Sequence, residues 1–233
     1  MPIALLALGL WFAASNPSFA GLAIDNNPPI SNSQSTIDRL VAVVGGDPIF
    51  LSDVRQAEQL RLIDLDGALA AVTADTDVPA SQQPLERLIN RRLVLGEAMR
   101  YLQPQPPSAD VDRALETWSA RFASAAERDA AIDAAAGGSL AVVRAFLADS
   151  LRIDRYLDQR FTAAAQPTRE EARAFHQANL ASFARGGVPA PFEEVEDIAR
   201  ARLSEQRRRL LVRDWLAAVR NRAQVQVVSG QRD

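Results

Sequence analysis

The chain has 233 residues, 48% of them hydrophobic, which is enough for one domain with a substantial core or for two small domains. Its formal net charge of −3 gives no sign of a nucleic-acid or anionic-membrane partner, since both attract strongly basic proteins. It has no cysteine and a single histidine, His176, which excludes thiol catalysis, disulfides, thiolate metal sites and multi-histidine metal sites.

The first 20 residues predict a signal peptide. Residues 1–15 carry no charge, and this run is shorter than the ~20 residues that a membrane-spanning helix needs. Ser18 and Ala20 are small residues at the −3 and −1 positions of a signal-peptidase site, which places cleavage between Ala20 and Gly21. A buried N-terminal helix is the alternative. We expect export to the periplasm, with a flexible polar lead over residues 21–36 in the mature chain.

A β hairpin is predicted next, at residues 41–51. The β-branched run from Val41 to Val44 indicates one strand, the Gly-Gly-Asp-Pro sequence that follows indicates a turn, and Ile49 to Leu51 indicates the second strand. Ser52 and Asp53 are then expected to cap a helix.

The rest of the chain is predicted to be mostly helical. Apolar residues recur at helical spacing, broken by Pro, Gly and capping residues. Ser108 and Ser139 are expected to be N-caps, and Thr168 with Glu171 a capping box. The expected helices cover about 52–65, 84–102, 109–123, 125–136, 140–161, 168–184 and 192–223, with a loop at 66–83.

Residues 224–228 alternate between polar and apolar side chains and predict a last short strand. A lone strand needs a partner, because unpaired backbone groups are costly when buried. The hairpin near the N-terminus is the only partner the sequence offers. We therefore expect a mainly α fold in which a small β element pairs an N-terminal hairpin with a C-terminal strand.

No catalytic constellation stands out in the sequence. It contains no Gly-rich phosphate loop, no nucleophile elbow and no HExxH motif. His176 is expected to be a surface or half-buried residue, since a lone base without a nucleophile has no chemistry to do. We therefore predict neither an enzyme nor a cofactor nor a metal site. Residues 200–233 hold nine Arg and three acids; a solvated helix face is favoured over a surface for an acidic partner.

The order of six segments resembles the SurA family of periplasmic chaperones. The stretch IDRLVAVVGGDPIFLSDVRQA is similar to the opening of the family's mature domain. Three further stretches are similar to the family helices that follow: LERLINRRLVLGEAMRYL, SADVDRALETWSARF and SLAVVRAFLADSLRIDRYLDQRF. The stretches PTREEARAFHQANLASF and PFEEVEDIARARLSEQRRRLLVRDWLAAVRNRAQVQVV are similar to the segments on either side of the family's parvulin isomerase domain. The resemblance covers residues 37–228.

In this chain only RGGVPAP, residues 185–191, stands where the family has its parvulin domain. The family's catalytic His pair belongs to that domain and has no counterpart here. The resemblance therefore implies a periplasmic, ATP-independent holdase that binds unfolded exported or outer-membrane proteins without isomerase activity. It implies no nucleic-acid partner and no stable membrane span after signal cleavage.

Aromatic residues on the predicted helices suggest where a client would bind. We predict that Trp118, Phe122 and Phe146 line an apolar groove, although core packing is the alternative for each. Two other functions stay open: a foldase related to peptidyl-prolyl isomerases, and a structural subunit that docks one fixed partner through the Arg-rich last helix.

Overall fold

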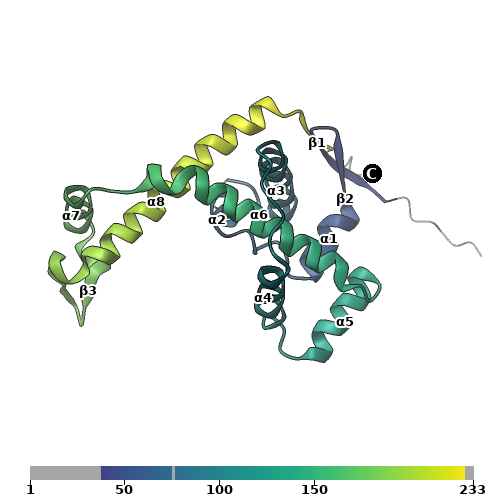
Figure 1. Cartoon of the computed structure of the whole chain (residues 1–233), viewed down its shortest axis with the longest axis horizontal. Helices are drawn as coiled ribbons and strands as arrows, with labels where there is room; N and C mark the ends of the chain where they lie inside the picture. The colour runs from purple at the N-terminus through teal and green to yellow at the C-terminus, as the bar shows by residue number, and fades with distance from the viewer. Residues whose placement is uncertain (1–37, 75–76, 229–233) are drawn as a thin grey trace, which may run out of the picture. The chain divides into compact units, whose positions relative to one another are not determined.

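The computed structural model describes residues 38–74 and 77–228, so the predicted signal peptide and flexible lead lie outside the described residues. The fold is mainly α with a small sheet, as predicted (Figure 1). In chain order the elements are β1 (Leu40–Val44), β2 (Asp47–Phe50), α1 (Leu51–Gln59), α2 (Gly67–Ala74), η1 (Ala80–Gln82), α3 (Gln83–Arg100), α4 (Ser108–Ser119), α5 (Ala125–Ala136), α6 (Leu140–Ala165), α7 (Arg169–Ala178), η2 (Leu180–Phe183), β3 (Ala184–Arg185), β4 (Val188–Pro189), α8 (Phe192–Arg222) and β5 (Val225–Val227).

The two ends of the described fold meet in one antiparallel sheet with the strand order β2-β1-β5. Ala42 of β1 lies opposite Ile49 of β2 and Val227 of β5. Long helix α8 leads from β4 back to this sheet (Figure 1). The predicted pairing of the last strand with the hairpin is therefore confirmed. Ala42 in the central strand is fully buried.

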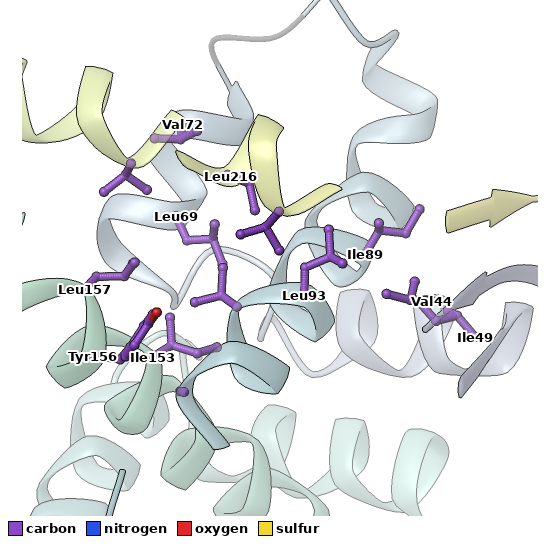
Figure 2. Packing of buried hydrophobic residues seen from close by; sticks show 14 of the residues in the cluster. Val44, Ile49, Leu69, Val72, Ile89, Leu93, Ile153, Tyr156, Leu157 and Leu216 are labelled. Atoms are coloured by element: carbon purple, nitrogen blue, oxygen red, sulfur yellow. The ribbon is translucent and has the colours of Figure 1, made fainter. Parts of the chain in front are cut away.

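The main core lies between the sheet and helices α2, α3, α6 and α8. Figure 2 shows Ile89 and Leu93 of α3 between the hairpin residues Val44 and Ile49 on one side and Leu69 of α2 on the other. The other apolar side chains labelled there come from α2, α6 and α8: Val72, Ile153, Tyr156, Leu157 and Leu216. Burial of these side chains is the principal stabilising contribution, at roughly 1.5–3 kcal/mol for each large one.

Helix α2 occupies part of the predicted loop, so that prediction was wrong over Gly67–Ala74. The segment GALAAVTA is rich in Ala, the best helix former. It also places Leu69 and Val72 in the main core, where they are 1% and 3% exposed. The backbone carbonyl of Asp66 accepts a hydrogen bond from Leu69 N–H at 2.9 Å and starts the helix.

The capping predictions have mixed outcomes. Ser139 accepts a hydrogen bond from Ala141 N–H, and the capping box of Thr168 and Glu171 is present, so both are confirmed. No side-chain cap is found at the start of α4, where Ser108 is already the first helical residue. Helix α1 starts one residue early at Leu51, because the carboxylate of Asp53 accepts from Phe50 N–H at 2.8 Å.

Residues 184–189, which overlap the RGGVPAP stretch, form a tight β hairpin of β3 and β4. Arg185 of β3 pairs with Val188 of β4, and Gly186 and Gly187 between them adopt φ of 62° and 86°. Those left-handed values favour glycine, which explains the Gly-Gly sequence at this turn.

A small separate core lies beneath that hairpin, and His176 belongs to it. Its members lie in α7, η2 and α8 and in the residue after β4: Ala172, Phe183, Ala190, Phe192, Val195 and Ala199. His176 is 5% exposed, and its Nε2 lies 2.9 Å from the carbonyl oxygen of Ala190. The expectation of a surface or half-buried histidine was therefore wrong, because the Phe183 and Phe192 rings and the Ala190 carbonyl enclose the imidazole.

Within the described ranges no single helix is both long and apolar enough to cross a membrane, although α5 and α6, bent by 92°, reach that length and composition together.

Candidate binding pocket

A pocket of about 430 Å³ lies between β2, α1, α3 and α6. Its volume falls within the ~300–1,000 Å³ that is usual for binding pockets. Its lining combines apolar side chains with a few charged ones: Asp47, Ile49, Asp53, Gln56, Ala57, Leu62, Leu88, Arg91, Arg92, Leu95, Met99, Val142, Phe146 and Asp149.

Helix α3 supplies the apolar wall. Leu88, Leu95 and Met99 are seven and four residues apart, so they lie along one face of the helix. The side chain of Met99 is 51% exposed, whereas Leu88 and Leu95 are half-buried. The wall is therefore accessible from solvent. Methionine is also the most adaptable apolar side chain, which suits contacts with varied partners.

Arg91 fixes one side of the pocket by joining α3 to α6. Its guanidinium stacks on the Phe146 ring, 3.5 Å from the centroid, and its Nη2 donates to the Phe146 carbonyl at 2.6 Å. Nη1 donates to Ser150 Oγ at 2.9 Å and forms an ion pair with Asp66. Arg91 and Asp66 are 7% and 4% exposed. Because all these partners are internal, Arg91 holds Phe146 in place rather than presenting a charge to a ligand.

The remaining charged groups lie around the apolar wall. Burial raises the pKa of Asp149, and the positive charge of Arg91 opposes that rise. Asp53 is occupied as the cap of α1. The positive charge of Arg92 likewise lowers the pKa of Asp149. The pocket thus combines an apolar wall with a few charged groups, a combination that is usual in binding pockets.

The end of α3, just beyond Met99, carries a second accessible apolar feature. Leu102 N–H donates to the Met99 carbonyl at 3.0 Å, and Gln103 N–H donates to the Ala98 carbonyl at 3.1 Å. This hydrogen-bond pair is a Schellman motif, in which Gly normally occupies the left-handed position. Here Leu102 occupies it with φ of 53°, and it is 87% exposed.

The three predicted groove residues separate into two groups. Trp118 is fully buried, its Nε1 donates to the Leu60 carbonyl at 2.7 Å, and it meets Phe122 edge-on at 5.1 Å. Phe122 is 8% exposed. Both therefore belong to a core formed by α4, α5, α6 and the turn after α1, and their prediction as groove residues was wrong. Phe146 does line the pocket.

The pocket residues that the sequence analysis missed are Leu88, Leu95 and Met99. Their helical spacing was visible in the sequence and indicated one apolar face. That spacing does not tell whether such a face meets a neighbouring helix or a solvent-filled pocket, since both require the same residue types.

The Arg-rich helix α8 uses several of its charges within the fold. Arg207 donates two hydrogen bonds to the Glu171 carboxylate, at 3.0 and 2.7 Å. Arg208 pairs with Asp158, and Arg220 pairs with Glu86. These internal ion pairs leave fewer basic groups available to an acidic partner than the composition alone suggests.

The described residues contain no cluster of His, Asp or Glu side chains that could hold a metal ion. No protein-family model matches the chain, and no curated protein sequence matches it.

Proposed function

We propose that the chain is an ATP-independent chaperone of the periplasm, which holds unfolded exported polypeptides at the pocket between α1, α3 and α6. The observation that carries this proposal is the accessible apolar wall of that pocket, with Met99 half exposed at its edge. An apolar pocket without a catalytic constellation suits retention of hydrophobic segments, because the hydrophobic effect needs no directional chemistry.

Leu102 supports the same assignment. A left-handed Leu costs about 1–2 kcal/mol relative to a right-handed one, and its side chain recovers little of this by burial because it is 87% exposed. Strained residues persist only where the surrounding structure imposes them, as the two hydrogen bonds of the Schellman motif do here, and such residues are concentrated at functional sites. We infer that Leu102 extends the client-binding surface beyond Met99.

The sequence resemblance supports the class of client and the compartment. The SurA-like order of segments implies outer-membrane proteins or other exported chains as clients, with no isomerase step. Such clients are rich in apolar side chains while unfolded, and the size of the pocket suits one or two of those side chains at a time. Binding is then weak at each contact and tolerant of sequence.

The experiment is suppression of aggregation. A urea-unfolded outer-membrane protein is diluted into buffer with and without the full chain, and light scattering is followed. We expect suppression near equimolar ratio, with little change between low and high salt because the contacts are apolar. Substitution Met99→Ser should weaken suppression several-fold.

Val188→Ser is the matched control. Val188 lies in β4, is 69% exposed and does not line the pocket, so its replacement removes a similar amount of exposed apolar surface elsewhere. Equal effects of Met99→Ser and Val188→Ser would mean that suppression arises from general surface hydrophobicity, and the assignment of the pocket would be wrong. No suppression by the wild-type chain would contradict the proposed function itself.

A further inference from the structure

The outer edge of strand β5 has free backbone hydrogen-bonding groups. The strand order β2-β1-β5 places β5 at the edge of the sheet. Val228 N–H donates to the Val41 carbonyl at 2.9 Å, so Val228 faces β1. Because residues in an antiparallel ladder alternate between facing and not facing the partner strand, Val227 directs its N–H and C=O away from β1. Neither group has a partner in residues 38–74 or 77–228.

The opposite edge of the same sheet is closed to a further strand. Pro48 of β2 lies opposite Val43 and has no N–H to donate. The N–H of Phe50 is already donated to the Asp53 carboxylate at 2.8 Å. Proline and occupied donors are ordinary means of protecting a sheet edge against pairing with another chain. Only the β5 side of the sheet therefore offers a backbone donor.

The β5 edge also lacks the usual protective side chains. The stretch QVQVV at 224–228 contains neither a charge nor a proline. Val227 and Val228 are 50% and 46% exposed. An edge with apolar β-branched residues and a free donor is a template for a further strand.

The length of β5 decides which occupant fits. Two copies of this chain joined edge to edge would share only the three residues of β5. Such a contact is far smaller than the about 1,200–2,000 Å² that a stable interface buries. A short, weak, exchangeable contact instead suits an extended peptide that is also held elsewhere on the protein.

We propose that β5 docks an extended segment of an unfolded client, which adds to the sheet as a fourth strand with alternating apolar residues. The client's backbone would accept from Val227 N–H and donate to the carbonyls of Val227 and Val225. This inference rests on the proposed chaperone function for the identity of the client, but the edge itself is defined by the sheet alone.

The test uses the full chain and a short synthetic peptide of alternating Val and Thr residues. Val227→Pro removes the outward N–H without removing a hydrogen bond to β1, so the fold should be retained. Val227→Thr is the matched control, since it keeps both the donor and the β-branched shape. We expect Val227→Pro to weaken peptide affinity by about tenfold. This loss equals about 1.4 kcal/mol, which is the size expected for one or two lost hydrogen bonds. Val227→Thr should change the affinity less than about twofold.

Amide hydrogen exchange of the wild-type chain provides a second measurement that needs no variant. Peptide binding should slow exchange at Val227 and leave Gln226, whose N–H faces β1, nearly unchanged. Unaltered exchange at Val227 under saturating peptide would overturn the proposal. So would equal losses of affinity in Val227→Thr and Val227→Pro, because the contact would then depend on the side chain rather than the backbone.

Two further outcomes separate this proposal from its rivals. Met99→Ser should reduce suppression of aggregation, while bound peptide still slows amide exchange at Val227. If the peptide slows exchange at Val227 but the wild-type chain does not suppress aggregation, the β5 site is supported and the chaperone function is contradicted. Self-association at rising concentration that disappears in Val227→Pro would identify a second copy as the occupant and overturn the client assignment.

Discussion

Asp154 on α6 is a carboxylate that the fold holds at a cost. A Cβ atom built on Gly67 would lie 3.1 Å from Asp154 Oδ1, which places the carboxylate against the start of α2. Burial raises the pKa of Asp154 to about 6 from its ordinary value of 3.8, and the negative charges of Asp66 and Asp158 add to the rise. Arg208 and Arg91 oppose it.

The magnitude follows from that pKa. Each tenfold difference in proton affinity corresponds to about 1.4 kcal/mol, so ionised Asp154 costs the folded chain about 3 kcal/mol at pH 7. The side chain is partly exposed, and an amide in its place must still be accommodated. We therefore expect Asp154→Asn to raise the free energy of unfolding at pH 7 by roughly 1–2 kcal/mol.

The pH dependence has a definite sign. Because the folded-state pKa is raised, the folded chain binds this proton more tightly than the unfolded chain does. The resulting stability is fully present below pH about 4 and is lost as the pH rises through about 6. Asp154→Asn should therefore gain more at pH 7 than at pH 4.5.

The assay is urea unfolding followed by far-ultraviolet circular dichroism at both pH values. Asp129→Asn on α5 is the control, since the Asp129 side chain is 61% exposed and should give little change at either pH. An Asp154→Asn variant that is no more stable than wild type at pH 7, or that keeps the full wild-type pH dependence between 4 and 6, would refute this account of Asp154.

Three other changes have defined outcomes. Leu102→Gly should raise the free energy of unfolding by about 1 kcal/mol in urea unfolding, because Gly adopts the left-handed conformation freely. The same change should weaken suppression of aggregation. A variant less stable than wild type would contradict the Schellman assignment. Thr168→Ala should lower the free energy of unfolding by about 1 kcal/mol, because it removes the N-cap of α7. Thr168→Ser is the conservative control. An unchanged unfolding midpoint in Thr168→Ala would contradict the role of this cap. Removal of residues 224–228 should speed amide exchange across the β1–β2 hairpin, and unchanged exchange there would mean that β5 does not support β1.

Local chemistry explains which parts of the fold were predictable. The hairpin, the Ser139 cap and the Thr168 capping box depend on residues close in sequence, and all three are confirmed. The bounds of the second strand were wrong, because Asp47 and Pro48 belong to β2 instead of the turn and Leu51 begins α1. The pairing of β5 was predictable because the sequence contains only one other predicted β element, the N-terminal hairpin. Helix α2 was missed because its Ala-rich segment is too short to show a clear apolar stripe, and its stability comes from contacts of Leu69 and Val72 with distant helices.

The pocket was harder to predict because its lining comes from segments about 100 residues apart. An aromatic residue on an apolar helix face looks the same whether it is enclosed or accessible. Trp118 is enclosed because the Leu60 carbonyl accepts its indole N–H, and that pairing joins residues 58 apart in sequence. Phe146 is only half-buried and lines the pocket, with the Arg91 guanidinium stacked on its ring. Neither the enclosure of Trp118 nor the accessibility of Phe146 can be recognised from the local sequence pattern.

The pairing of β1 with β5 also sets when the fold can close. About 180 residues separate the paired positions, so at roughly 5–20 residues per second the ribosome needs about 10–40 seconds after β1 to supply its partner. During that interval the sheet lacks one of its three strands, and the neighbouring core beneath α8 is uncovered. A nascent chain of this design stays incompletely folded until β5 has been synthesised.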